Sequence, residues 1–336
     1  MTTITCLPNE LLLNVFNKFD TLTHLAKCRA VCKTWKKLAE RTMLGHVIAI
    51  TSYEAKMRSL YAFLQAVPAR QHLLKHLHFC LTRPHRSIDT IRLIQLVLTP
   101  SIESLTGHIF DQVLSNLFID IIQGSCTDRL GRLNTLALSC HIGPPFEVAL
   151  RCRATIQDLW LYNIMAPWTL ADRLSEFQHL TFLTLATQTV NISLVDKILD
   201  NCLHLQELSL GFIVEHYEQQ APTATSIKKH PTLKALTIRP HSVWLLFFLM
   251  DYFFSKLINI EEISVNALAY PTLTDQDRDN FLRIPKLIHQ VAQKELTCTL
   301  VHKDDARALL LYLKQAGYNR TIKAISSGRY LIEVAL

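Results

Sequence analysis

Glycine is scarce in this chain, which has only 8 glycines among 336 residues. Phosphate-binding loops depend on closely spaced glycines, and the sequence contains neither G-x-G-x-x-G nor a Walker sequence. Charged residues make up only 19% of the chain and hydrophobic residues 49%, which is typical of a folded protein. The composition therefore argues against nucleotide or flavin chemistry and against disorder.

The cysteines show no metal-binding spacing. The nine cysteines are odd in number and scattered, with no C-x-x-C pair, so we expect buried thiols in a reducing cytosol or nucleus. His72, His76, His78 and Cys80 form the densest metal-like cluster. No acidic residue lies close in sequence, and His78 and Cys80 fall on a strand pattern. Structural or surface histidines are favoured, and neither a metal nor a cofactor is expected.

Signals for a membrane or for secretion are also missing. The longest apolar run, Val243 to Phe254, is shorter than the roughly 20 residues of a membrane span, and Asp251 interrupts it. The N-terminus lacks the basic start and apolar centre of a signal peptide. We therefore expect a buried helix at 243–254, no membrane partner, and a cytoplasmic or nuclear protein.

Enzyme motifs are not found either. The acidic run Asp275–Asp279 lacks the glycine and the final glutamate of a calcium loop. No G-x-S-x-G occurs, and no cysteine stands out as a nucleophile. The sequence predicts a protein that is not an enzyme and that has no catalytic residue.

The first 44 residues show the apolar spacing of three short helices. In the first, apolar residues recur every three or four positions, which predicts one helix face. Pro8 suits the first helical turn, and Glu10 places a negative charge at the positive end of the helix. Thr21 follows as a candidate cap for a second helix, and a third pattern surrounds Trp35. The residues of the first face are Leu7, Leu11, Leu12, Val15, Phe16 and Phe19.

This segment resembles the F-box. The family pattern runs Leu-Pro, Glu, a hydrophobic helix, a short turn and a Val-Cys-x-x-Trp close. Phe19 stands where a leucine is commoner, and Lys18 where an aromatic is often found. The matching residues are Leu7, Pro8, Glu10, Leu11, Leu12, Val15, Phe16, Phe19, Leu22, Leu25, Val31, Cys32, Trp35, Leu38 and Ala39.

The resemblance implies a docking device. F-box proteins bind the small Skp adaptor, which joins them to a cullin–RING ubiquitin ligase. The alternative is that the matching residues are simply the core of a helical hairpin. The residues that would line the adaptor contact or set its shape are Leu7, Pro8, Leu11, Leu12, Val15, Phe16, Leu25, Val31 and Trp35.

Positive charge collects in the later helices of this segment. The adaptor family is acidic, so this charge would speed encounter with it. A solvated basic face or a nucleic-acid patch are the alternatives, but no aromatic interleaving or DNA-binding motif accompanies the charge, so no nucleic-acid partner is expected. Against Glu40 alone stand Lys27, Arg29, Lys33, Lys36, Lys37 and Arg41.

A short strand pattern, L-x-x-L-x-L, recurs along the rest of the chain with helical patterns between the copies. Its middle position advances by about 23 to 31 residues, the period of leucine-rich repeats. The section resembles the irregular leucine-rich repeats that follow many F-boxes, especially in fungal proteins. The loop asparagine or cysteine of the regular repeat is replaced, so the loops must be satisfied otherwise. The middle positions are Leu77, Leu105, Leu136, Leu159, Leu183, Leu208, Leu236 and Ile263.

The predicted fold class is α/β. An F-box at 1–46 precedes a leucine-rich-repeat solenoid at 47–336, with parallel strands on a concave face, helices on a convex face, and a terminal cap from about residue 300. Asp304–Gln315 reads as a helix of the cap, and Ile322–Val334 reads as two strands around a turn at 327–328.

The strand pattern also predicts which side chains face outward. In L-x-L the leucines point inward, which places Trp160 and Tyr162 on the concave face. Arg239 and His78 fall on the same face and are weaker candidates. Two aromatics among small residues predict a pocket for a protein substrate, although two isolated exposed aromatics would be unremarkable. The small neighbours are Ala137, Ser139, Thr184, Ala186, Ser209 and Gly211.

Together these observations predict the substrate-recognition subunit of a Skp–cullin–F-box ubiquitin ligase. Its expected partners are a Skp-type adaptor, the cullin–RING ligase reached through it, and a protein substrate of unknown identity. The alternative is a Skp-binding or free repeat scaffold that works outside ubiquitin ligation.

Overall fold

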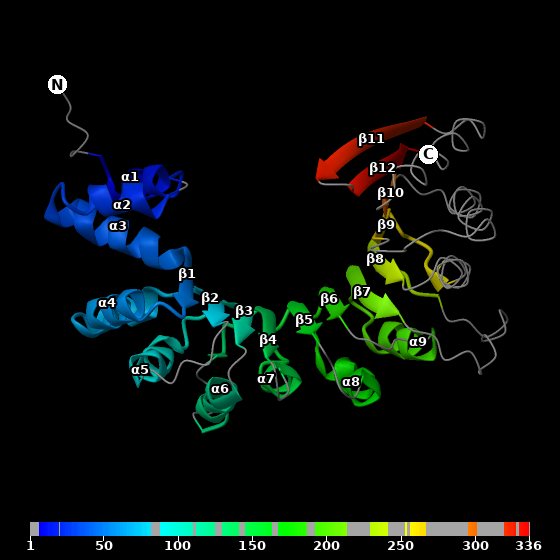
Figure 1. Cartoon of the computed structure of the whole chain (residues 1–336), viewed down its shortest axis with the longest axis horizontal. Coiled ribbons are helices and arrows are strands. Elements are labelled where there is room, and N and C mark those ends of the chain that lie inside the picture. The colour runs from blue at the N-terminus through cyan, green and yellow to red at the C-terminus, as the bar shows by residue number, and fades with distance from the viewer. Residues whose placement is uncertain are drawn as a thin grey trace. The chain divides into compact units, whose positions relative to one another are not determined.

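The computed structural model describes residues 7–19, 21–81, 88–109, 112–124, 130–140, 145–162, 167–186, 192–213, 229–240, 253, 256–266, 295–300, 319–326 and 329–335. Contacts divide the chain into two compact units, Met1–Thr155 and Ile156–Leu336. Each unit is described by itself below, and Figure 1 shows the elements of both.

Unit 1 begins with the three predicted helices, α1 (Asn9–Phe16), α2 (Leu22–Cys28) and α3 (Lys33–Gly45). Pro8 is the N-cap of α1 and precedes its first turn. The Pro8 carbonyl accepts hydrogen bonds from the backbone N–H groups of Leu11 and Leu12, both at 3.1 Å. Proline suits this position because it has no N–H group to leave unpaired.

A small apolar core holds the three helices together. Phe16, Leu25 and Ala39 form its buried centre, and the Phe16 ring meets the edge of Trp35 with a centroid distance of 5.2 Å. The single apolar face predicted for the first helix divides into two. Leu12 and Phe16 are buried, while Leu11 and Val15 are exposed. The partly buried residues packed against the core are Phe19, Cys28, Trp35, Leu38 and Met43.

The rest of unit 1 alternates strands and helices as the sequence predicts, in an α/β solenoid-like arrangement. The four strands are parallel and pair in chain order, and helices α4 to α7 lie on one side of them (Figure 1). The elements are β1 (Val47–Thr51), α4 (Glu54–Gln65), the 3-10 helix η2 (Pro68–Leu73), β2 (His76–Leu81), α5 (Ile88–Val97), β3 (Ser104–Ile109), α6 (Gln112–Gly124), β4 (Thr135–Cys140) and α7 (Pro145–Arg151).

In unit 2, strands alternate with helices from β5 to β7 in the part that the structure describes. Strands β5 to β10 are parallel and pair in chain order. The elements are β5 (Asp158–Tyr162), α8 (Pro167–Arg173), the 3-10 helix η4 (Leu174–Glu176), β6 (Phe182–Ala186), α9 (Ile192–Asn201), β7 (Glu207–Ile213), β8 (Ala235–Pro240), β9 (Glu262–Asn266), β10 (Glu295–Leu300), β11 (Asn319–Ser326) and β12 (Arg329–Ala335).

The C-terminal strands form the predicted hairpin. β12 pairs antiparallel with β11 and also with β10, a strand that the sequence pattern did not predict. The predicted cap helix at 304–315 lies outside the described residues, and so does most of the apolar segment 243–254.

The recurring leucines explain why the repeats stack. Most copies of the pattern place one apolar side chain just before a strand and two within it, and those that the structure describes are buried. The strand and the helix of one repeat cover only part of each other's apolar face. The neighbouring repeats cover the rest, so the repeats must stack. In β5 the inward Leu159 and Leu161 alternate with the outward Asp158, Trp160 and Tyr162.

A repeated hydrogen-bond pattern joins neighbouring strands at the edge where they begin. A carbonyl one residue before a strand accepts two backbone N–H groups from the next repeat, as Lys75 does from Glu103 at 2.7 Å and Ser104 at 3.0 Å. This pattern satisfies the backbone of the loops, which a buried chain requires. The other carbonyls that act this way are those of Glu103, Gln157, Thr181, Gln206 and Lys234.

A buried lysine links two repeats of unit 2. The Lys256 side chain is 1% exposed, and its ammonium group donates to the carboxylates of Asp196 and Asp200. The second of these contacts is 3.0 Å long. Both aspartates lie on α9, about two repeats earlier in the sequence. This pairing ties α9 to the later repeat because the buried ammonium group of Lys256 could not stay charged without its partners except at a large cost, whereas the two aspartates remain partly exposed.

A partly buried ion-pair network joins the N-terminal helices to the first repeat. Glu40 of α3 accepts hydrogen bonds from Arg29, which follows α2, at 2.9 Å and from Arg70 of η2 at 3.0 and 3.1 Å. The Arg70 guanidinium lies 3.9 Å from the centre of the Phe63 ring on α4 and donates to the Phe63 carbonyl at 2.8 Å. The network therefore crosses from α2 and α3 to the first repeat.

The same contacts set the acidity of Glu40. Burial by itself would raise the pKa of this carboxyl, but the hydrogen bonds and charge of Arg70, and then of Arg29, outweigh burial and lower the pKa below its ordinary value of 4.5. A carboxyl whose pKa is lower in the folded state stabilises the fold above its unfolded pKa. That stability is lost as the pH falls through the folded value.

We predict that Glu40→Gln lowers the free energy of unfolding by about 2 kcal/mol at neutral pH, because two partly buried guanidinium groups lose their counter-charge. Urea denaturation measures this difference. The difference in unfolding free energy between the variant and the unmodified chain should shrink as the pH falls below 4.5 and through the lowered pKa of Glu40, because Glu40 then becomes protonated. Glu103→Gln is the matched control, since its ion pair with Lys75 is more exposed and is worth at most about 1 kcal/mol. Equal losses in the two variants would contradict the assigned role of Glu40.

Gly107 fills a position in β3 that no other residue can occupy. Its φ is +101°, and a Cβ built on it would lie 2.1 Å from the Phe79 carbonyl oxygen. Gly107 also pairs in register with Phe79, whose ring meets the edge of Phe118 with a centroid distance of 5.8 Å. The absent side chain therefore allows β2 and β3 to approach each other.

Gly107→Ala should destabilise unit 1 by about 3 kcal/mol or more, since it adds both backbone strain and an overlap with main-chain atoms. Thermal or urea unfolding followed by circular dichroism measures the change. Gly45→Ala is the control, because nothing lies within 4 Å of its Cβ position. That substitution should change stability by less than about 1 kcal/mol. A Gly107 variant as stable as the Gly45 variant would refute this account.

Candidate functional site

The first candidate site is an exposed apolar stripe on α1. Leu11 is 50% exposed and Val15 is 43% exposed, and they lie one turn apart. Leu12 and Phe16, the next residues along, are buried beneath them. The helix thus has two apolar stripes, one used by its own core and one left open.

Other predicted docking residues divide in the same way. Leu7 and Pro8 are exposed, and Val31, in the turn between α2 and α3, is 55% exposed. Leu25 is fully buried and Trp35 is half-buried, so these two hold the helices in place. Leu22 is 41% exposed and joins the candidates, although the sequence analysis did not select it. Leu22 could have been selected from the sequence, because it is one of the residues that match the F-box pattern.

Trp35 is fixed by packing. Its ring lies at 74° to that of Phe16, and within the described part of the chain its buried indole N–H has no hydrogen-bond partner. A partner-free N–H at this position costs stability, which the burial of the large ring offsets. Trp35 therefore sets the spacing between α1 and α3.

The positive charge predicted for these helices is mostly exposed. Arg29 is the exception, because it is half-buried and bonded to Glu40. The remaining basic side chains give the domain a positive surface that would attract an acidic partner. These exposed residues are Lys27, Lys33, Lys36, Lys37 and Arg41.

The segment that forms these three helices is similar in sequence to a known protein family. Residues 4–46 match the family model described as F-box-like. The match supports an F-box protein, and the F-box-like domain implies binding to a Skp-type partner and suggests an adaptor role in Skp–cullin–F-box complexes. No curated protein matches the chain.

F-box proteins are generally non-catalytic adaptors. Within the described residues there is no cluster of His, Cys, Asp or Glu that could hold a metal ion. The structure places His72 on η2 and His76, His78 and Cys80 on β2, where His78 shares a hydrogen bond of 2.9 Å with Thr106. Among the described helices, none has the length and apolar character needed to span a membrane.

Two described thiols are held in their neutral form. Burial raises the pKa of Cys152 to about 11, although the charge of Arg151 lowers it in part, and burial raises the pKa of Cys202 to about 12. A thiol with such a pKa carries almost no thiolate at neutral pH and is a poor nucleophile. Both cysteines therefore serve packing.

The second candidate site is the outward face of the sheet in unit 2. Trp160 is 37% exposed, as the alternation predicts. Its ring stacks on Phe182 of the next strand, with a centroid distance of 5.5 Å and an interplanar angle of 22°. Sequence reasoning missed Phe182, although it lies two residues before Thr184 and so has the same outward parity. Trp160 therefore belongs to an aromatic pair.

The remaining predicted residues of this face are spread over several strands. Tyr162 is half-buried at the end of β5, and Arg239 lies on β8, three strands away. Gly211 falls where the register between β7 and β8 shifts, so it is not a simple outward position. His78 belongs to unit 1.

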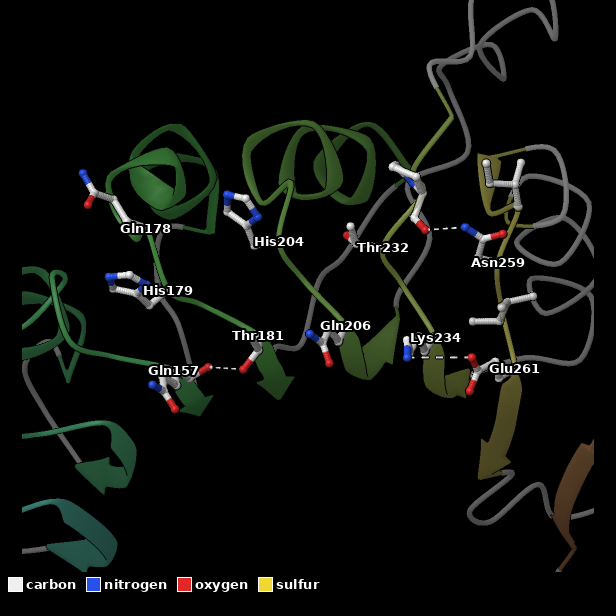
Figure 2. Close-up of a pocket in the computed structure, with 13 residues that line it drawn as sticks. Gln157, Gln178, His179, Thr181, His204, Gln206, Thr232, Lys234, Asn259 and Glu261 are labelled. Carbon is white, nitrogen blue, oxygen red and sulfur yellow. Dashed lines mark hydrogen bonds and ion pairs between the residues drawn. The ribbon is translucent and has the colours of Figure 1, made fainter.

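A groove lined mostly by residues with polar side chains runs along the edge where the strands of unit 2 begin, and Figure 2 shows these side chains. It has a volume of about 1090 Å³. Its floor includes Thr181, which donates to the Gln157 carbonyl at 3.3 Å, and Lys234, whose ammonium lies 3.9 Å from the Glu261 carboxylate. His179 and His204 line its wall. The groove carries no converging set of catalytic groups.

Proposed function

We propose that this chain is the substrate-recognition subunit of a Skp–cullin–F-box ubiquitin ligase. Residues 1–46 dock to the Skp adaptor, and residues 47–336, as a leucine-rich-repeat domain, bind a protein substrate. The observation that carries the proposal is the exposed pair Leu11 and Val15 above the buried pair Leu12 and Phe16 in a domain that matches the F-box-like family.

The three N-terminal helices leave apolar side chains exposed, which favours a protein partner. A domain of about 40 residues buries too little apolar surface to be stable without support. Exposed leucine and valine side chains on a small domain mark a protein contact, because covering them removes apolar area from water. The contacting residues are Leu7, Pro8, Leu11, Val15 and Val31, and the residues that hold their shape are Leu12, Phe16, Leu25 and Trp35.

The contribution to ubiquitin transfer is proximity. The adaptor would link the chain to the cullin and its RING subunit, and the repeats would hold the substrate near the ubiquitin-loaded enzyme. The chain supplies no acid, base or nucleophile in this scheme. It would act in the cytoplasm or the nucleus, where these ligases work.

The ion pairs of Glu40 support a scheme in which the N-terminal helices bind the adaptor and the repeats bind the substrate. They connect α2 and α3 to η2, and the contacts of Arg70 with the Phe63 ring and carbonyl extend this connection to α4. Such a connection favours transfer because it limits how the docking helices can turn relative to the first repeat.

We predict that Leu11→Glu together with Val15→Glu weakens binding to a Skp adaptor by about 100-fold or more, since a charged group would be buried at the contact. Isothermal titration of the purified full chain with the adaptor measures the affinity. Because both side chains are exposed, the unfolding midpoint should stay close to that of the unmodified chain.

Ile88→Glu with Val67→Glu is the matched control. These two side chains are also exposed and apolar, but they lie outside the F-box-like domain. The control should bind the adaptor normally. Unchanged adaptor affinity in the Leu11 and Val15 variant would exclude α1 as the docking surface.

A further inference from the structure

The aromatic pair of unit 2 lies in a row of carboxylates. Phe182 pairs in register with Asp158 on one side and with Glu207 on the other, so both carboxylates flank the ring. Neighbouring strands are about 4.8 Å apart, which brings all three side chains within reach of one ligand group. Glu207 is exposed, and the Trp160 ring covers one face of the Phe182 ring.

Farther along this row, Glu262 is also exposed. The next row of outward positions, level with Trp160, carries small hydroxyl side chains that leave room for a bound chain. Among the outward positions of β5 to β9 whose side chains the structure describes, none is lysine or arginine, and Arg239 lies near the end of β8 away from the carboxylate row. The row of hydroxyl residues consists of Thr184, Ser209, Thr237 and Ser264.

This combination favours one class of partner. A stacked indole and phenyl ring attract a cation above the ring face, and nearby carboxylates attract the same cation. Nucleic acid would also stack on the rings, but its phosphates would be repelled by the carboxylates. A purely apolar partner would have to cover the exposed carboxylates of Glu207 and Glu262 without pairing them, which is costly.

We propose that this face binds an extended basic peptide segment, with an arginine side chain placed on the Trp160–Phe182 pair and bonded to the carboxylate of Glu207. Arginine fits better than lysine because its planar guanidinium stacks on a ring and can bond a carboxylate with two N–H groups. The hydroxyl row can bond the peptide backbone. The inference rests on the proposed function in one respect, that the segment belongs to the substrate.

Selectivity for a basic peptide must arise at this face alone. The whole chain has a net charge of +7, which would repel a basic segment at a distance. Binding therefore depends on contacts made at the rings and carboxylates, and substitutions there should have large effects.

The test uses the full chain and three fluorescein-labelled peptides, in which serine alternates with arginine, lysine or glutamate. Fluorescence anisotropy should show the arginine peptide binding more tightly than the lysine peptide, and the glutamate peptide not binding. Trp160→Ala and Glu207→Lys should each weaken the arginine peptide by about tenfold or more.

Tyr53→Ala and Glu147→Lys are the controls, since they change an exposed aromatic and an exposed carboxylate elsewhere in the chain. Both should bind the arginine peptide normally. Absence of binding by the arginine peptide, equal binding of the lysine peptide, or full binding by the Trp160 variant would overturn the proposal.

Adaptor affinity is measured on the same variants. Trp160→Ala and Glu207→Lys should bind the Skp adaptor as the unmodified chain does, because neither side chain belongs to the F-box-like domain. Failure of peptide binding with normal adaptor binding rejects this inference alone, whereas failure of adaptor binding in the unmodified chain rejects the proposed function.

Discussion

The bonds that Glu40 makes to Arg29 and Arg70 join two parts of unit 1 that have separate cores. The helices α1 to α3 pack around Phe16 and Leu25, while the repeats pack around their strand leucines. A partly buried carboxylate with two guanidinium partners holds such parts together with direction as well as strength. The Phe63 ring beneath Arg70 completes the connection.

The core of the three helices also fixes which apolar side chains of α1 stay exposed. Leu12 and Phe16 are committed to the core, so Leu11 and Val15 cannot turn inward without breaking it. The open stripe is therefore a fixed surface on a fixed domain. The sheet face of unit 2 is built by the same logic, since the inward leucines of each strand compel their neighbours to face outward.

The sequence predicted the repeating elements well, because a strand pattern with period two and a helix pattern with period near 3.6 are local properties. It could not separate Leu11 from Leu12, since both fit an apolar helix face and only the packing of α3 decides which one is covered. It also missed the pairing of Glu40 with Arg70, which are 30 residues apart, and the stacking of Trp160 on Phe182. Such contacts depend on how repeats stack, and β10 likewise became a strand through its pairing with β9 and β12.

We propose that the F-box-like helices connect this chain, through a Skp adaptor, to a cullin. The most direct measurement mixes the purified full chain with a Skp adaptor and a cullin and follows the mixture by gel filtration with light scattering. The account predicts one species that contains a single copy of each of the three proteins. A chain that elutes apart from the adaptor would contradict it, and so would a complex of chain and adaptor that leaves the cullin free.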